Sequence, residues 1–252
     1  STTSYEYDAV GNKIKETDAL GNVTQFFYDA QNNLIRTVFA DDSEISATYS
    51  AAKLQLSQTD EMSNTTTFEY DLAGRKVKSV LPEVYDALSN TNQSPVEEYS
   101  YDKNGNLTAT RDALGNLYNT VYDSRNRKIA EVSPAIKLAD GSYARPIKQS
   151  VYDAVGNVIK AIDPNGNATD TVYDNANRAV SVTFPEVEVD GNGTSGGTLQ
   201  RPQELRSYDK NGNVISATNP RGIVTETSYN CFNKPVLVVK NAGAASESDK
   251  IT

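Results

Sequence analysis

Polar and apolar residues alternate along short segments of this chain, and the segments recur at regular intervals. In one of them, Thr24, Phe26 and Tyr28 fall on one side of an extended strand and Gln25 falls on the other. The same alternation returns in residues 66–70, 118–122, 169–173 and 225–229. A period of two is typical of β-strands, and no helical pattern of useful length appears.

A tyrosine marks each recurrence, and we call it the lead Tyr. Successive lead Tyr residues are 21 residues apart, or 30, 31 or 35 residues apart where extra residues are inserted. A fixed period of this size indicates one small structural unit stacked many times. The lead positions are Tyr7, Tyr28, Tyr49, Tyr70, Tyr101, Tyr122, Tyr152, Tyr173, Tyr208 and Tyr229.

Each repeat carries two predicted tight turns about ten residues apart. The phrase Asp-x-x-Gly-Asn occupies residues 8–12 and 18–22 of the first repeat. An Asp at the first turn position can accept hydrogen bonds from the amides ahead of it, and Gly at the fourth position tolerates positive φ. Asn33, Asn126 and Asn177 take the glycine place in other repeats, and Asn is also tolerant of left-handed backbone.

Two turns ten residues apart leave strands of about five or six residues, so one repeat is expected to be one hairpin. We therefore predict an all-β fold of tandem antiparallel hairpins, about 21 residues each, that form a continuous curved or spiral sheet. Two repeats together have the four strands of a propeller blade, so a β-propeller is the alternative. Because both halves of such a pair carry the same Tyr-Asp phrase, the hairpin is the preferred unit.

Three repeats contain insertions, near residues 83–94, 135–145 and 186–201. We expect loops or short extra hairpins there, on one edge of the array. They either form a binding face or cover an exposed sheet edge. Prolines, which lack a ladder donor, stand at both ends of each insertion: Pro82 and Pro95, Pro134 and Pro146, and Pro185 and Pro202.

Residues 1–252 are predicted to be a single array of about ten repeats with a polar tail at 241–252. Thr3, Tyr5 and Tyr7 correspond to Thr24, Phe26 and Tyr28, so the chain starts in the middle of a repeat. No atypical capping unit is visible at either end. We therefore expect a fragment of a longer polypeptide.

The composition argues against several classes of partner. The net charge is −9 and the Lys and Arg residues form no basic track, which argues against nucleic acid and anionic membrane surfaces. No run of 18 apolar residues is present, so no membrane insertion is expected. Histidine is absent, and the single Cys231 makes neither an internal disulfide nor a zinc site.

No catalytic, cofactor-binding or metal-binding residue is predicted, because turns explain the recurring aspartates. Segments such as residues 102–106 resemble part of a calcium loop but lack its closing Glu. The row of tyrosines could stack on sugars, although an aromatic row at strand spacing usually reflects packing. Carboxylate pairs for acid–base catalysis are not excluded by sequence.

The phrase Tyr-Asp-x-x-Gly-Asn-x-Ile, followed by Asp-x-x-Gly-Asn-x-Thr and a new Tyr-Asp, resembles the Rhs or YD-repeat family. Residues 7–29 and 101–123 match best, whereas Ser50 and Asn230 replace the Asp. The signature residues are Tyr7, Asp8, Gly11, Asp18, Gly21, Tyr28, Asp29, Tyr70, Asp71, Gly74, Tyr101, Asp102, Gly105, Asp112, Gly115, Tyr122, Asp123, Tyr152, Asp153, Gly156, Asp163, Gly166, Tyr173, Asp174, Tyr208, Asp209 and Gly212.

The resemblance implies a β-ribbon wound into a hollow shell. In bacterial polymorphic toxins and insecticidal toxin complexes such a shell encloses a C-terminal toxin, and related repeats occur in teneurin adhesion receptors. It implies a non-enzymatic wall segment whose partners are further repeats and cargo of the same polypeptide, in a secreted or cell-surface parent. The alternative is an adhesion module that binds a carbohydrate or a partner protein. Asp163 lies in an Asp-Pro-x-Gly setting like that of family self-cleavage sites, but we expect a turn there.

Overall fold

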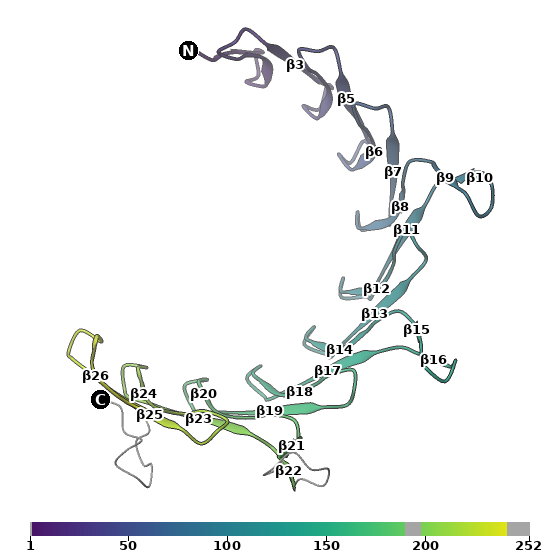
Figure 1. Ribbon diagram of the computed structural model, residues 1–252. Coiled ribbons are helices and arrows are strands. Elements are labelled where there is room, and N and C mark those ends of the chain that lie inside the picture. Colours follow the sequence, from purple (N-terminus) through teal and green to yellow (C-terminus); the bar gives the residue numbers. More distant parts are fainter. Residues whose placement is uncertain (1, 190–197, 241–252) are drawn as a thin grey trace. The chain divides into compact units, whose positions relative to one another are not determined.

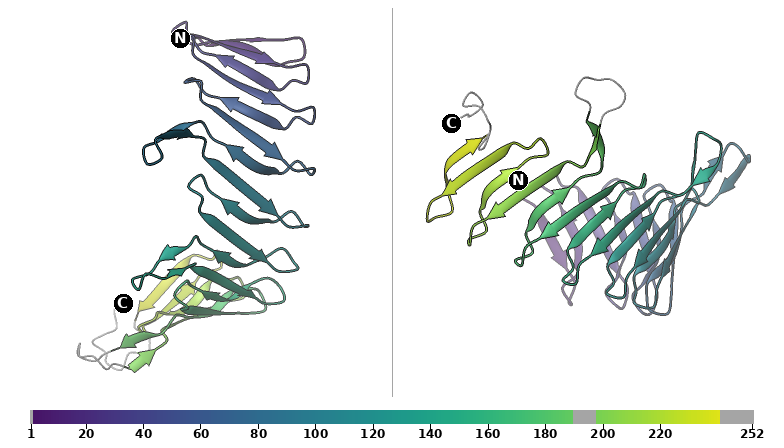
Figure 2. Two further views of the ribbon diagram at one scale, coloured as in Figure 1. Left: turned by 90° about the vertical axis from the view of Figure 1, so that its right-hand side faces the viewer. Right: turned by 90° about the horizontal axis from the view of Figure 1, so that it is seen from below.

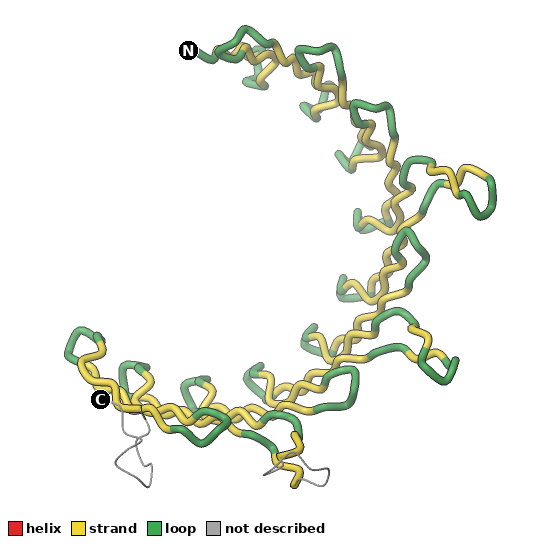
Figure 3. Tube along the Cα trace, in the orientation of Figure 1, coloured by secondary structure: helices red, strands yellow, loops and turns green. Residues whose placement is uncertain are grey.

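A computed structural model describes residues 2–189 and 198–240, and all of the regular structure in these residues is β-strand (Figure 3). The chain divides into two compact units, Ser1–Thr120 and Val121–Thr252, which are considered separately. Within each unit the strands of the main sheet pair antiparallel in chain order (Figure 1). The prediction of an all-β chain built from tandem antiparallel hairpins is confirmed.

The first unit contains the strands that precede and follow five lead Tyr residues. Their lengths alternate between six and five residues after the first strand, as the spacing of the turns predicted. The strands are β1 (Ser4–Tyr7), β2 (Lys13–Thr17), β3 (Val23–Tyr28), β4 (Leu34–Val38), β5 (Glu44–Tyr49), β6 (Gln55–Thr59), β7 (Thr65–Tyr70), β8 (Lys76–Val80), β11 (Val96–Tyr101), β12 (Leu107–Arg111) and most of β13 (Leu117–Tyr122), whose last two residues belong to the second unit.

The second unit repeats the same arrangement. Its main strands are β14 (Lys128–Val132), β17 (Ile147–Tyr152), β18 (Val158–Ile162), β19 (Ala168–Tyr173), β20 (Ala179–Thr183), β23 (Gln203–Tyr208), β24 (Val214–Thr218), β25 (Val224–Tyr229) and β26 (Pro235–Lys240). In both units the pairing runs through consecutive strands without breaks into separate four-stranded blades. The propeller alternative is therefore wrong.

Two kinds of turn join these strands, and they lie on opposite edges of each unit (Figure 2). The lead turn is the five-residue segment directly after each lead Tyr, and the second turn closes the other edge. The strand register shifts beside the lead Tyr, for example between Glu6 and Tyr7 and between Val151 and Tyr152. Such a bulge increases the local twist of the strand pair at the lead turns.

The insertions take the place of second turns. Each contains a short two-stranded hairpin that forms a separate small sheet. The hairpins are β9 (Val84–Asp86) with β10 (Thr91–Gln93), β15 (Ile136–Lys137) with β16 (Tyr143–Ala144), and β21 (Val187–Val189) with β22 (Thr198–Gln200). Residues 190–197 of the third insertion and the predicted polar tail at 241–252 lie outside the described residues.

Burial differs from that of an ordinary globular domain, because no apolar side chain among the described residues is fully buried. The buried side chains in this part of the chain are Thr37 and Ser79, with exposed fractions of 4% and 1%. They stand opposite Phe26 and Phe68 on neighbouring strands. Each unit is thus a sheet whose two faces are both partly exposed, and contacts between neighbouring repeats must supply its stability.

The described residues include no helix long and apolar enough to cross a membrane.

Candidate functional site: the lead-turn ladder

The lead turns form a row along one edge of each unit, and we call this row the lead-turn ladder. Many signature residues lie here: the lead Tyr ends a strand, and the Asp or its replacement begins the turn. The signature residues Asp18, Gly21, Asp112, Gly115, Asp163 and Gly166 lie instead in second turns on the other edge. The ladder therefore brings the Tyr-Asp pairs of successive repeats together but not the second aspartates.

Within one turn, the Asp side chain closes the loop on itself. Asp102 Oδ1 accepts hydrogen bonds from the amides of Asn104 and Asn106, both at 2.9 Å. Its Oδ2 accepts a third from Asn106 Nδ2 at 2.9 Å. The backbone adds a bond from the Gly105 amide to the Asp102 carbonyl at 3.1 Å. Both carboxylate oxygens thus have partners inside the turn.

These hydrogen bonds stabilise the charged carboxylate and change its titration. The side-chain bond from Asn22, followed by the amide bond of the same residue, lowers the pKa of Asp18 below its ordinary value of 3.8. Asn167 lowers the pKa of Asp163 in the same way. Asp163 also accepts the Asn165 amide at 2.8 Å, so its setting is that of a turn.

The fourth turn position has positive φ whichever residue stands there. Gly105 has φ 89°, Asn126 has φ 61° and Asn177 has φ 59°. In the second repeat, however, the residue with positive φ is Asn32, at 62°, and the prediction of Asn33 is wrong. Asn33 is the fifth residue, and its Nδ2 donates to Asp29 Oδ2 at 2.8 Å. Because Asn32 and Asn33 are adjacent, the sequence alone did not show which of the two has positive φ.

In most repeats the lead Tyr hydroxyl links the repeat to the one before it. Tyr70 Oη donates to the carbonyl of Gln55 at 2.8 Å, and Gln55 is the first residue after the preceding lead turn. Equivalent bonds join Tyr28 to Lys13, Tyr101 to Lys76, Tyr152 to Lys128, Tyr173 to Val158, Tyr208 to Ala179 and Tyr229 to Val214. The recurring Tyr is therefore a junction residue as well as a strand residue.

In short repeats an asparagine pair adds a second link. Asn157 Nδ2 donates to Asp153 Oδ2 within its own turn at 2.8 Å and to Asn177 Oδ1 in the next turn at 2.9 Å. The pairs Asn12–Asn32 and Asn213–Asn233 repeat this contact at 3.1 and 2.9 Å. The left-handed Asn thus has a role that Gly cannot fill, because its side chain accepts the bond from the preceding repeat.

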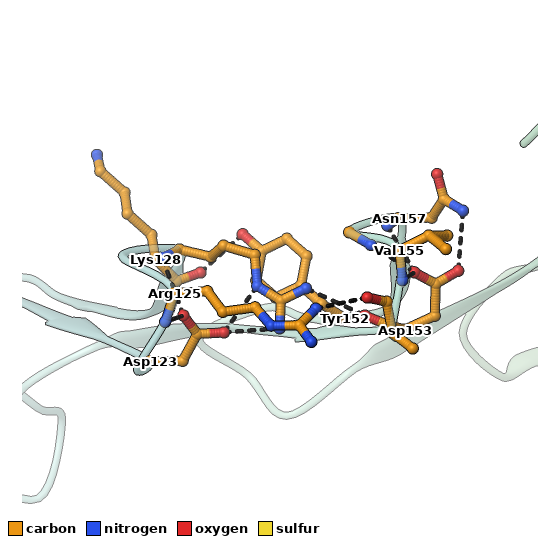
Figure 4. Close-up of polar contacts among 10 residues, drawn as sticks. Asp123, Arg125, Lys128, Tyr152, Asp153, Val155 and Asn157 are labelled. Carbon is orange, nitrogen blue, oxygen red and sulfur yellow. Dashed lines mark hydrogen bonds and ion pairs between the residues drawn. The ribbon is translucent and has the colours of Figure 1, made fainter.

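In the three repeats that carry insertions, arginine replaces asparagine at the fifth turn position. Arg127 Nε donates to Asp123 Oδ2 at 2.7 Å, and its Nη1 donates to the carbonyl of Asp153 in the next turn at 3.0 Å. The guanidinium carbon of Arg127 lies 4.5 Å from the centre of the Tyr152 ring. Figure 4 shows Asp123 and Arg125 of one turn beside Tyr152 and Asp153 of the next. Arg125 reaches the carbonyl of Ala154 across the same junction.

We call this arrangement the Arg clasp, and it recurs with similar geometry. Arg75 contacts Asp71, Asp102 and the Tyr101 ring, and Arg178 contacts Asp174, Asp209 and the Tyr208 ring. The sequence analysis missed these arginines. A signal was present: the fifth residue after the lead Tyr is Arg only in the long repeats.

The bases of the insertions are closed by one repeated backbone bond. The amide of Ser133 donates to the carbonyl of Pro146 at 2.8 Å, and Leu81 with Pro95 and Phe184 with Pro202 do the same at 2.8 Å. Arg201 strengthens the third base, because its Nε donates to Phe184 O at 2.9 Å and its Nη1 pairs with Asp170 at 2.7 Å. Each insertion is thus a stem joined to the main sheet by a fixed base.

Metal binding and small-molecule binding have little support in the described part of the chain. There the structure contains no group of three or more His, Cys, Asp or Glu residues placed to hold a metal ion. A shallow hollow of about 170 Å³ lies over β4, β5 and β6, lined by Ile35, Ile45 and Tyr49. None of the residues that line this hollow belongs to a lead turn. The lead-turn ladder is therefore best suited to joining repeats.

Comparison with known families and structures gives the following matches. Residues 7–44 and 152–186 match the family model described as RHS Repeat, which confirms the resemblance seen in the sequence for these segments. No curated protein matched the chain.

Two solved structures are similar over most of the chain. The crystal structure of TcdB2-TccC3-Cdc42 has 17% identity and a TM-score of 0.48 over 97% of this chain and 15% of its own. The Photorhabdus luminescens Tc holotoxin pore has 16% identity and a TM-score of 0.47 over 94% and 15%. This chain thus spans about 15% of the length of the chains it matches. Both TM-scores lie below 0.5.

Proposed function

We propose, from the Rhs repeats that this chain carries, that it is a non-enzymatic wall segment of a shell that encloses a toxin or other cargo. The cargo would be a C-terminal part of the same polypeptide, and residues 1–252 would act as one array within it. The parent protein would be secreted or held at the cell surface. Containment is then the mechanism: the wall keeps proteases and water-borne partners away from the cargo.

The observation that carries this proposal is a sheet that, in the part of the chain that the structure describes, lacks an apolar core and whose neighbouring repeats are linked along one edge. Tyr hydroxyls, Asn pairs and Arg clasps all cross from one lead turn to the next. A globular domain would place its stability in a buried core, whereas a wall needs cohesion between adjacent units. The contacts between lead turns provide this cohesion without adding a second layer.

The charge chemistry of the turns suits a wall that persists over a wide pH range. The chain has no histidine, so no imidazole titrates between pH 5 and 8. The turn aspartates have their pKa lowered from 3.8, for Asp18 by the bonds from Asn22 and for Asp71 by those from Arg75. They stay charged, and the turns stay closed, through neutral and mildly acidic conditions.

A protection assay tests containment. The parent polypeptide, with the segment that follows this chain, is exposed to a broad-specificity protease at neutral pH. The matched variant carries Arg75→Asn, Arg127→Asn and Arg178→Asn, which keep the bond inside each turn and remove the contacts that these three arginines make with the next turn. We expect the downstream segment to survive in the native protein and to be cut faster in the variant. Rapid digestion of the downstream segment in the native protein would contradict a wall function.

One observation favours the adhesion alternative. The insertion hairpins present exposed apolar side chains, among them Tyr85 at 64% and Tyr143 at 70%. Aromatic rings in such positions can contact a glycan or a partner protein. Selective glycan binding that disappears in Tyr85→Ser and Tyr143→Ser variants, with the hairpin strands intact, would support recognition. Absence of binding across a glycan array would leave the wall function as the better account.

A further inference from the structure

One face of the first unit carries a row of aromatic rings with one ring missing. Each member of the row stands two residues before a lead Tyr, and the members are Tyr5, Phe26, Ala47, Phe68 and Tyr99. We call this set the ring row. Every member except Ala47, which stands in the middle, has an aromatic side chain. Neighbouring members lie two strands apart, which is roughly 10 Å in a sheet.

The strand register places Ala47 in line with the rings beside it. Phe26 stands opposite Thr37, and Thr37 stands opposite Ile45. Ile45 and Ala47 are two residues apart in β5, so their side chains point to the same face of the sheet. The pairing of β5 with β6 and of β6 with β7 relates Ala47 to Phe68 in the same way. The methyl group of Ala47 therefore leaves a gap between two rings on one face.

The hollow over β4, β5 and β6 lies at this gap. Thr37, Ile45 and Ala47 line it, and its volume is about 170 Å³. A cavity of about 150 Å³ lined by apolar side chains can hold one benzene ring. The hollow is open on its solvent side, so a ring inside it can stay attached to a larger molecule outside. The gap thus has room for the one side chain that the row lacks.

A lysine lies between the rings wherever two members of the row are both aromatic neighbours. Lys13 Nζ lies 5.6 Å from the centre of the Tyr5 ring and 4.5 Å from that of Phe26. Lys76 Nζ lies between the last two rings of the row in the same way, at 5.5 and 4.7 Å. Both lysines are the first residue after a lead turn. These positions therefore show what fills the row where no ring is missing.

Beside the gap, the same positions hold residues without a charge. Leu34 precedes Ala47 and Gln55 follows it, each as the first residue after a lead turn, and both line the hollow. Gln58 lines it as well. Leu34 offers apolar surface to a ring, and an amide can donate or accept a hydrogen bond. This lining suits a Tyr side chain, whose body is apolar and whose hydroxyl needs a polar partner.

We propose that the hollow at Ala47 binds an aromatic side chain, Tyr before Phe, of a second polypeptide. The guest ring takes the place between Phe26 and Phe68 and packs on Ile45, and a Tyr hydroxyl bonds to an amide that lines the hollow. A polypeptide is the class of partner that carries such a ring on a one-carbon stem, as the members of the row do. The segment that carries the ring lies outside the hollow. This inference is independent of the proposed wall function.

Methyl NMR of the intact chain, titrated with a short peptide, tests the site. The probe is the peptide Gly-Ser-Tyr-Ser-Gly with blocked ends, and the control peptide has Ser in place of Tyr. Single-ring contacts are weak, so we expect the probe to shift the methyl signals of Ile45 and Ala47 at concentrations up to about 10 mM. It should bind about ten- to a hundredfold more tightly than the control, as burial of one ring predicts. No shift at these methyl groups, or equal shifts with both peptides, would overturn the proposal.

Substitutions at the gap test the position of the guest. Ala47→Phe places a ring of the chain itself in the hollow and should abolish binding of the probe. Thr171→Phe is the matched control, because Thr171 also stands two residues before a lead Tyr, in the second unit, and it should leave binding unchanged. Ala47→Val narrows the hollow with a smaller change and should weaken binding. Undiminished binding to both Ala47 variants, or equal loss in Thr171→Phe, would refute the assignment.

Discussion

The junction between the eighth and ninth repeats allows a sharp test of the Arg clasp. Arg178 pairs with Asp174 inside its own turn through Nε at 2.7 Å and Nη2 at 2.6 Å. It reaches the next turn through Nη1, 3.1 Å from the Asp209 carbonyl, and lies 4.6 Å from the centre of the Tyr208 ring. Arg178→Asn keeps a donor for Asp174, as Asn157 does for Asp153, and removes both contacts with the next repeat.

The magnitude follows from the two contacts that are lost. A cation over a partly exposed ring contributes about 0.5–1 kcal/mol, and a hydrogen bond to a carbonyl contributes about 0.5–1.5 kcal/mol. We therefore expect Arg178→Asn to destabilise this junction by about 1–2 kcal/mol. Arg178→Ala should cost more, because it also removes the bond that closes the turn on Asp174.

A second substitution should restore part of the loss. In short junctions an Asn at the fourth position of the next turn accepts the bond, and Gly212 holds that position here. Gly212 has φ 90°, and a Cβ added there would meet no atom within 4 Å. Asn tolerates left-handed backbone, so Arg178→Asn with Gly212→Asn should rebuild the link and recover about 0.5–1 kcal/mol. Gly212→Asn alone, with Arg178 in place, is the control.

Native-state hydrogen exchange read by mass spectrometry is the suitable assay, because repeat arrays open locally and do not unfold in one step. Peptides from β20 and β23 should exchange faster in the single Asn variant, by about five- to thirtyfold for 1–2 kcal/mol. Peptides from β7 and β8 should not change. If the amides of β20 and β23 exchange at the native rate in Arg178→Asn but faster in Arg178→Ala, then Arg178 stabilises only its own turn. In that case its contacts with the next repeat do not contribute the expected amount of about 1–2 kcal/mol.

Three further predictions concern the same ladder. Tyr70→Phe removes the bond to the Gln55 carbonyl and should lower local stability by about 1 kcal/mol, measured by exchange of β6 amides; an unchanged rate would contradict the junction role. Asn177→Gly keeps the left-handed turn but removes the acceptor for Asn157, so urea titration should show a lower midpoint than for the native chain; an equal midpoint would mean that only φ matters. The turn aspartates have folded pKa values below their ordinary 3.8, so they stabilise the fold above that pH and cease to do so as the pH falls through the lowered values. Urea midpoints should therefore hold between pH 7 and 5 and fall below about pH 3.8, and a drop between pH 7 and 5 would refute this account.

The features that were predictable from sequence are those set by local chemistry. The conformation of a turn is set by its own five residues, so Asp18 and Gly21 predict a turn whatever the rest of the chain contacts. The alternation of Thr66, Phe68 and Tyr70 likewise fixes which side chains share a face. Period, turn positions and strand lengths therefore follow from the sequence.

The junction contacts were not predictable in the same way, because they depend on residues 15 to 31 positions apart. Whether Arg178 meets Asp209 depends on the pairing of β20 with β23 across an insertion. The left-handed Asn32 was misplaced by one residue, since its neighbour Asn33 is the same residue type. Phe39 shows a further limit: it begins a second turn, with its amide bonded to the Ser43 carbonyl, in the place usually held by Asp. There the third turn residue, Asp41, supplies the carboxylate, and its Oδ1 accepts hydrogen bonds from the Ser43 amide at 3.1 Å and the Ser43 hydroxyl at 2.6 Å.

The position of the Arg clasps also has an energetic reason. In the long repeats a five-residue second turn is replaced by an insertion about three times as long, so closing that edge costs more chain entropy. Loop closure rises by about 0.6 kcal/mol for each doubling, which gives about 1 kcal/mol here. The contacts that one clasp makes with the next repeat contribute about 1–2 kcal/mol. The Arg clasps therefore occur in the repeats whose opposite edge has the highest entropic cost of loop closure. They offset that cost without adding a second layer to the sheet.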